Sequence, residues 1–106
     1  MAVTLCTDAD FQQLIDSGKP TIVKYYADWC GNCKLIAPKY RRLSEDARFS
    51  DIAFLDINAE ENEGARRTAG VDNLPFFALF KDGKLIKGKA ASREEAIVAL
   101  LEELNS

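Results

Sequence analysis

Residues 27–34 read Ala27-Asp28-Trp29-Cys30-Gly31-Asn32-Cys33-Lys34 and place two cysteines three positions apart. A segment rich in β-branched and aromatic residues ends here, and apolar residues with helical spacing follow. A helix that begins at Cys30 points unpaired backbone N–H groups and the positive end of its dipole at the Cys30 sulfur, which favours the thiolate. We therefore expect Cys30 to act as a nucleophile and Cys33, one turn further on, to resolve a mixed disulfide on Cys30.

Other uses of a paired-cysteine motif fit this chain less well. A self-contained structural zinc site needs four ligands, and the chain has three Cys and no His. Attachment of a c-type haem requires His directly after the second Cys, where this chain has Lys34. A purely structural disulfide stays open as an alternative, although so short a loop constrains the unfolded chain little. The motif therefore indicates redox chemistry that needs neither a metal nor an organic cofactor.

Composition and charge narrow the class of protein. With 106 residues, 47% of them hydrophobic and 29% charged, the chain is expected to fold as one domain over residues 1–106. A formal net charge of −3 and the lack of a basic stripe or tail argue against nucleic-acid binding. The N-terminal residues show neither a basic region nor a long apolar run, so that no export signal or membrane span is expected. An odd number of cysteines fits a reducing compartment, and we expect a cytoplasmic protein.

Strand and helix patterns alternate along the rest of the chain. Strands are predicted at residues 3–6, 21–27, 52–57, 76–80 and 84–87, with helices before Gly18, after Cys30, before Gly70 and after Ser92. Thr7, Asp8 and Asp10 are typical of a cap for the first helix, and Pro38 is expected to kink the second. Asp82-Gly83 predicts a hairpin between the last two strands. The order indicates the α/β class, with a mixed sheet of about five strands between about four helices.

Four motifs in register resemble the thioredoxin family over nearly the whole chain. They are the WCGNCK stretch at 29–34, Pro38 inside the following helix, Leu74-Pro75 before a Phe-rich strand, and the FKDG stretch at 80–83. A C-x-x-C motif near a βαβ pattern is itself typical of thioredoxin-like redox proteins. The resemblance implies the thioredoxin fold.

The resemblance also implies a site. It places a redox-active disulfide between Cys30 and Cys33 at the start of the second helix, facing a cis peptide bond before Pro75. It implies a shallow groove in which an extended substrate segment pairs with backbone groups of Leu74. The substrate-binding residues would be Trp29, Gly31, Leu74, Pro75 and Ala90. From the residues alone, Trp29 also fits a packing aromatic, and Pro75 also fits the first position of a strand.

The function that follows is protein thiol-disulfide oxidoreduction of the thioredoxin type. The expected partners are disulfide-containing protein substrates and a reductase such as a thioredoxin reductase, and the protein is expected to be a monomer. A specialised oxidase or isomerase with the same thiols is one alternative. A partner-binding module, in which the thiols are incidental, is another.

Two departures from the family pattern surround the groove. Thioredoxins typically have Pro where this chain has Asn32, and Asn restores a backbone N–H that Pro lacks. We expect Asn32 to tune the couple toward a more oxidising potential. Ala90 takes the place of a groove Gly, and Phe76 follows Pro75 where a small or polar residue is common, which predicts a narrower substrate range.

A third departure lies beneath the expected disulfide. Family members usually have a buried Asp six residues before the first Cys, where it assists proton transfer at the resolving thiol, and this chain has Lys24. Phe54 is taken as the counterpart of the family's partner Lys, so that no ion pair is expected. Lys24 either reaches solvent at the sheet edge, or lies near Cys33 and favours its thiolate or accepts its proton. Cys6 is expected to be a buried small hydrophobe.

Overall fold

The computed structural model describes residues 3–105, which form a single five-stranded mixed sheet with helices on both faces. The strands are β1 (Val3–Leu5), β2 (Thr21–Tyr26), β3 (Ala53–Asn58), β4 (Phe76–Lys81) and β5 (Lys84–Ala90). Their spatial order is β1-β3-β2-β4-β5, with the first three strands parallel and the last two antiparallel to their neighbours. The predicted mixed α/β architecture is confirmed. Residues 1, 2 and 106, which the predicted single domain includes, lie outside the described part, so the domain bounds stay a prediction.

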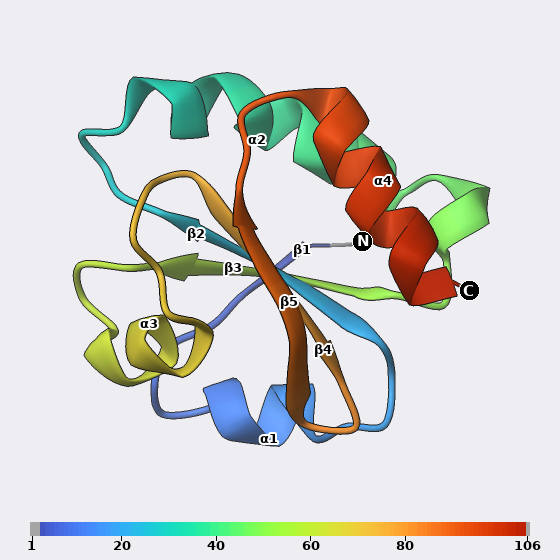
Figure 1. Cartoon of the computed structure of the whole chain (residues 1–106), viewed down its shortest axis with the longest axis horizontal. Coiled ribbons are helices and arrows are strands. Elements are labelled where there is room, and N and C mark those ends of the chain that lie inside the picture. The colour runs from blue at the N-terminus through green and yellow to red at the C-terminus, as the bar shows by residue number, and fades with distance from the viewer. Residues whose placement is uncertain (1–2, 106) are drawn as a thin grey trace.

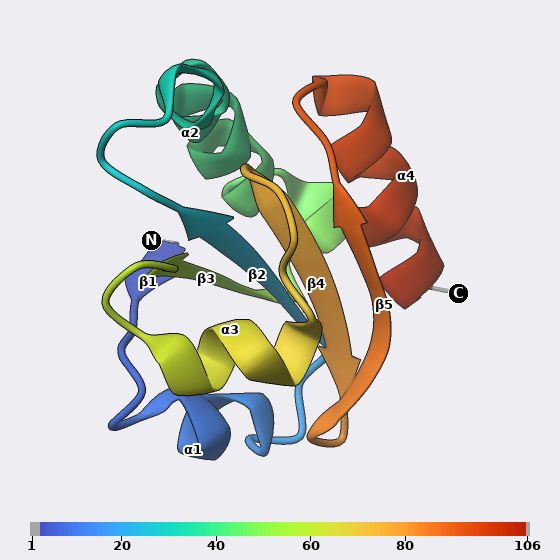
Figure 2. The same cartoon turned by 60° about the vertical axis from the view of Figure 1, so that its left-hand side comes forward.

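The helices form one pair on each face of the sheet (Figures 1 and 2). Helices α1 (Phe11–Ile15) and α3 (Glu63–Ala69) cover one face, whereas α2 (Gly31–Ser44) and α4 (Glu94–Asn105) cover the other, beside the short 3-10 helix η1 (Ala47–Phe49). Strand β2 lies in the middle of the sheet and contributes to both apolar clusters, Val23 and Tyr25 to the first and Ile22 to the second. This explains why its sequence is apolar at successive positions instead of alternating.

The β4–β5 hairpin forms at the predicted Asp-Gly pair. Asp82 has φ 55° and Gly83 has φ 78°, the left-handed backbone that a two-residue hairpin turn requires. A Cβ atom on Gly83 would also overlap the Asp16 carboxylate. Glycine at position 83 is therefore favoured both by the turn and by its surroundings.

Some element bounds differ from the sequence prediction. Strand β1 ends at Leu5, β5 continues to Ala90, and α4 begins at Glu94, one residue later than a cap at Ser92 predicts. Helix α2 continues through Pro38, and the bend expected there stays a prediction. These ends depend on long-range pairing, which local propensity does not determine.

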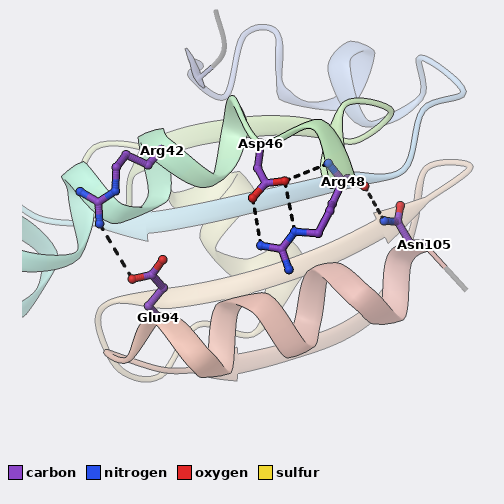
Figure 3. Close-up of polar contacts among 5 residues, drawn as sticks. All are labelled: Arg42, Asp46, Arg48, Glu94 and Asn105. Carbon is purple, nitrogen blue, oxygen red and sulfur yellow. Dashed lines mark hydrogen bonds and ion pairs between the residues drawn. The ribbon is translucent and has the colours of Figure 1, made fainter.

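Polar contacts connect α4 both to the last turn of α2 and to the segment that follows it (Figure 3). The Asn105 side chain donates to the Arg48 backbone carbonyl at 2.8 Å, and Arg42 forms a long ion pair of 3.9 Å with Glu94. Asp46 caps η1 by accepting from the Arg48 backbone N–H at 2.9 Å. All of these contacts lie at the rim of the second apolar cluster, where solvent weakens them.

Candidate active site

The two cysteines lie where the central strand passes into α2. Cys30 is the N-cap residue of α2, and its sulfur accepts a hydrogen bond from the Cys33 N–H at 3.1 Å. Cys30 and Cys33 form a disulfide, with their Cα atoms 5.3 Å apart. The prediction that the first sulfur meets the amino-terminal end of a helix is confirmed. Such a position stabilises negative charge on sulfur when the disulfide is reduced.

A shallow hollow of about 230 Å³ lies beside the disulfide. It is lined by Asn32 from α2, Leu74 and Pro75 from the loop before β4, and Ala90 at the end of β5. The Leu74–Pro75 peptide bond is cis, as the resemblance implied. Leu74 also packs against the cluster that contains both cysteines, which connects the hollow to the reactive sulfurs.

Trp29 and Gly31 lie outside the lining of this hollow. The Trp29 side chain is 67% exposed, and its indole N–H donates a hydrogen bond to the Glu60 carboxylate. Trp29 is therefore not a core aromatic, and its exposed ring lies one residue from Cys30. Gly31 is exposed, with open space around the position of a Cβ atom. Trp29 and Gly31 are thus exposed residues on either side of Cys30 in the sequence. The other predicted groove and tuning residues, Asn32, Leu74, Pro75 and Ala90, line the hollow.

Asn73 was not predicted as a site residue. Its side-chain oxygen accepts a hydrogen bond from the Leu74 N–H at 2.9 Å, and Asn73 also lines the hollow. The backbone donor expected to pair with substrate is therefore occupied in the free protein. An Asn directly before the expected groove residue was the available signal, because Asn side chains bond readily to nearby backbone groups.

The structure corrects the expectation for Lys24. The strand register places Lys24 opposite Asp56, and Ile22 opposite Phe54. Asp56, and not Phe54, therefore stands at the position of the family's partner Lys. Lys24 is 3% exposed, and its Nζ lies 3.4 Å from Asp56 Oδ1. The interpretation that Lys24 reaches solvent is wrong, because the neighbouring strand supplies a carboxylate that pairs with the buried ammonium. Compared with the family pattern, the ion pair is kept with its charges exchanged.

A second cavity, of about 180 Å³, links this ion pair to the disulfide. Lys24, Asp56 and Cys33 all line it, together with Tyr26, Ala27, Asp28, Lys34 and Ala37. Burial raises the pKa of Asp56 above its usual range, and the positive charge of Lys24 partly offsets that rise. The interpretation of Lys24 that places it near Cys33 therefore agrees with the structure, whereas Asp56 was not predicted as a site residue.

Comparison with known proteins now identifies the family. The family model described as Thioredoxin matches residues 2–103. This chain belongs to the thioredoxin family. Among curated relatives, thioredoxin of Alicyclobacillus acidocaldarius subsp. acidocaldarius is 35% identical over 86 residues, which cover 81% of each protein. Thioredoxin of Mycobacterium bovis is 34% identical over 100 residues, covering 93% of this chain and 84% of the relative.

The relatives differ in length. Thioredoxin F2, chloroplastic, of Arabidopsis thaliana is 34% identical over 89 residues, but these cover 83% of this chain and only 47% of the relative. The chain thus spans about half the length of the chloroplastic thioredoxin and most of the length of the bacterial ones.

Solved structures show the same thioredoxin fold. Thioredoxin of Malassezia sympodialis superposes with a TM-score of 0.91 at 21% identity, covering 100% of this chain and 96% of that one. A structure described as a complex of ferredoxin:thioredoxin reductase and thioredoxin f2 gives a TM-score of 0.91 at 30% identity, covering 99% of this chain and 96% of that one. The family and the disulfide at the WCGxC position together support thiol-disulfide oxidoreductase activity.

Two further observations concern membranes and metals. Within residues 3–105, none of the helices combines the length and the apolar character needed to span a bilayer. The same residues contain no group of three or more His, Cys, Asp or Glu side chains placed to hold a metal ion.

Proposed function

We propose that this chain reduces disulfides of protein substrates by dithiol-disulfide exchange. The observation that carries the proposal is the Cys30 sulfur at the amino-terminal end of α2, paired with Cys33 and next to an open hollow. The Cys30 thiolate attacks one sulfur of the target disulfide, so a Cys30–target bond forms and the target S–S bond breaks. The Cys33 thiolate then attacks the Cys30 sulfur and releases the second target thiol. Two electrons pass to the target, and the Cys30–Cys33 disulfide forms.

We also propose that the hollow and its surroundings bind the substrate. Leu74 packs against the cluster that contains both sulfurs, and its backbone N–H becomes available to substrate when the Asn73 side chain is displaced. Pro75 and Ala90 line the same hollow. Trp29 and Gly31 border the sulfurs and leave room for an extended segment. Backbone pairing with an extended segment gives affinity with little dependence on its sequence.

A coupled reduction assay tests the proposal. Reduced wild-type protein, regenerated by a thioredoxin reductase and NADPH, is expected to reduce insulin disulfides, and Cys30→Ser is expected to abolish the reaction. Cys33→Ser is expected to stop turnover and accumulate a mixed disulfide with the substrate, because the resolving thiol is missing. Cys6→Ser serves as the matched control and should retain activity. Full activity of Cys30→Ser would contradict the proposal.

Asn32 favours a second candidate function, the oxidation or isomerisation of disulfides. Because a residue at this position with a backbone N–H can stabilise the reduced thiolate, the protein would be better suited to oxidise or rearrange disulfides than a Pro-containing relative. Refolding of scrambled ribonuclease faster than insulin reduction would favour that function. Binding of partners that does not change on loss of Cys30 would favour the partner-binding module instead.

We propose a dithiol or flavoprotein reductase as the electron donor. The thioredoxin f2 structure, which is described as a complex with a ferredoxin:thioredoxin reductase, supports a reductase as a partner but does not specify its chemistry. A cytoplasmic location and a monomeric state also stay proposals, since the relatives include chloroplastic proteins. Subcellular fractionation and sedimentation of the reduced protein test these two proposals.

A further inference from the structure

We infer that Asp56 is the group that accepts the Cys33 proton during the resolving step, and that Lys24 positions it. The inference rests on the proposed function and deepens it, because it concerns how Cys33 becomes a nucleophile. Cys33 lies in the first turn of α2 and is 3% exposed, so bulk solvent reaches its sulfur poorly. A buried thiol that has to ionise needs an acceptor close to it.

The cavity beneath α2 connects the two groups. Cys33 and Asp56 both line it, and its volume of about 180 Å³ exceeds that of a single water molecule, which occupies about 30 Å³ in the liquid. The cavity is therefore large enough for a water molecule, and Cys33, Asp56 and Lys24 are the lining residues that can supply its polar partners. Asp56 Oδ1 is buried and, apart from the Lys24 ion pair, has no hydrogen-bond partner within residues 3–105.

Lys24 is not the acceptor, because its contacts stabilise the ammonium cation. Its Nζ lies 3.4 Å from Asp56 Oδ1, and it lies over the rings of Tyr40 at 5.3 Å and Tyr26 at 5.7 Å. Both kinds of contact weaken when a lysine becomes neutral. Its role is to hold the Asp56 carboxylate in place and to keep it ionised.

Other titratable groups lie near Asp56 and are the alternative proton acceptors to consider. Besides Lys24, the titratable groups near it are Cys6 after β1, Tyr26 and Asp28 from β2 and its following loop, and Lys34, Tyr40 and Arg41 from α2. Asp28 is the only other carboxylate among them. Burial raises the pKa of Asp56 and brings it nearer to that of a thiol, which makes proton transfer easier than to an ordinary carboxylate.

The resulting step is balanced. The Cys33 thiol transfers its proton to Asp56, which leaves a thiolate and a neutral carboxylic acid. The thiolate attacks the Cys30 sulfur, the bond from Cys30 to the target breaks, and the target leaves as a thiolate. That thiolate takes up a proton from the carboxylic acid or from solvent, which restores the Asp56 carboxylate.

The test separates the two steps of exchange. Reduced protein is mixed with excess 5,5′-dithiobis-(2-nitrobenzoate), and release of the coloured thiol is followed by stopped flow from pH 5 to pH 10. The first release reports attack by Cys30, and the second reports attack by Cys33. Asp56→Asn is expected to slow the second release by about a hundredfold near neutral pH, at the lower end of the range of general base catalysis. The difference should vanish at alkaline pH, and the first release should change less than about twofold.

Three further variants make the result decisive. Lys24→Gln keeps the carboxylate but removes its cation, which raises the pKa of Asp56 further, so the acidic limb of the second release should move to higher pH. Lys24→Gln combined with Asp56→Asn removes both charges and keeps similar volumes, so it should fold and show the same slow release. Asp28→Asn is expected to behave as wild type.

Each outcome bears on a different claim. Loss of the first release in wild type would overturn the proposed function itself. An unchanged second release in both Asp56→Asn and the neutral double variant, or an equal slowing by Asp28→Asn, would overturn the inference about Asp56 alone.

Discussion

The surroundings of the Cys6 thiol separate it chemically from Cys30, whose sulfur lies at the amino-terminal end of α2 and accepts the Cys33 N–H. Cys6 is 1% exposed, and burial together with the nearby Asp10 and Asp56 raises its pKa to about 12. We expect iodoacetamide at pH 8 to alkylate Cys30 in the reduced protein while Cys6 stays unmodified, because thiols react as thiolates. Mass spectrometry of the digested protein checks this. Labelling of Cys6 at a rate similar to that of Cys30 before denaturant is added would contradict it.

The raised pKa of Cys6 also affects how the stability of the protein depends on pH. Because the pKa of Cys6 is above its ordinary value of 9.0 in the folded protein, folding favours the neutral thiol. The contribution of Cys6 to stability is therefore complete below pH 9 and is lost as pH rises toward 12. Cys6 adds nothing to the pH dependence of stability near neutrality.

Asn32 tunes the couple through the backbone of the first turn. It follows the N-cap Cys30 by two positions, where a backbone N–H points toward the negative charge of a reduced sulfur. Asn32→Pro removes that donor, which should destabilise the reduced form and lower the reduction potential by about 30 mV if one such bond contributes about 1.4 kcal/mol. Equilibration of both proteins with glutathione buffers measures the shift. No shift, or a higher potential for Asn32→Pro, would refute the assignment.

Asn73 competes with substrate for a backbone donor. Its side chain accepts the Leu74 N–H at 2.9 Å, so a substrate carbonyl has to displace it. We expect Asn73→Ala to lower KM for an extended disulfide peptide about twofold to tenfold, because one hydrogen bond contributes about 0.5–1.5 kcal/mol. The value of kcat should not change. The matched control is the exposed neighbour Asp72→Ala, and a KM for Asn73→Ala at or above that of wild type would count against this role.

The ion-pair partner of Lys24 could not be predicted from the sequence. A charged side chain inside an apolar strand indicates a partner, but the partner depends on how β2 pairs with β3. A register that differs by two residues keeps the same face of the sheet, so both Phe54 and Asp56 are consistent with the alternating pattern. Cys30 and the Asp82-Gly83 turn could be predicted because their signals are local.

Helix α3 takes its N-terminal cap from a distant part of the chain. The Asp8 carboxylate accepts hydrogen bonds from the Gly64 N–H at 3.0 Å and the Ala65 N–H at 2.8 Å. Asp8 was predicted to cap the first helix, whereas it connects the segment after β1 to α3. The sequence favoured the nearest helix, and only the fold brings the amino-terminal end of α3 to Asp8.

We expect Asp8→Ala to lower the free energy of unfolding by about 1–2 kcal/mol, the usual range for loss of a helix cap. Asp8→Asn should lose less, because an amide oxygen can still accept one of the two N–H groups. Urea unfolding followed by circular dichroism measures the change, with Asp51→Ala as an exposed control. Equal stability of Asp8→Ala and wild type would show that solvent satisfies these groups as well as the carboxylate does.

The apolar layers on the two faces of the sheet, more than the ion pairs at its rim, hold the molecule together. Leu101 of α4 is fully buried in the cluster that joins α2 and α4 to the sheet, whereas the Arg42–Glu94 pair spans 3.9 Å between largely exposed side chains. Removing a buried leucine side chain loses its transfer free energy and leaves a cavity, which together lower stability by about 2–5 kcal/mol. An exposed ion pair contributes about 0–1 kcal/mol and is screened by salt.

The buried leucine and the exposed ion pair should respond differently to mutation and to salt. Leu101→Ala should lower the free energy of unfolding by about 2–5 kcal/mol at every salt concentration, and Arg42→Ala by less than about 1 kcal/mol, with the smaller effect fading in 1 M salt. Because the disulfide lies at the amino-terminal end of α2 and Arg42 lies in its last turn, Arg42→Ala should also leave insulin reduction unchanged. Urea unfolding of the reduced proteins at low and high salt decides the matter. A larger effect of Arg42→Ala than of Leu101→Ala would mean that the helix pair is held to the sheet chiefly by charge, and the apolar account of this fold would be wrong.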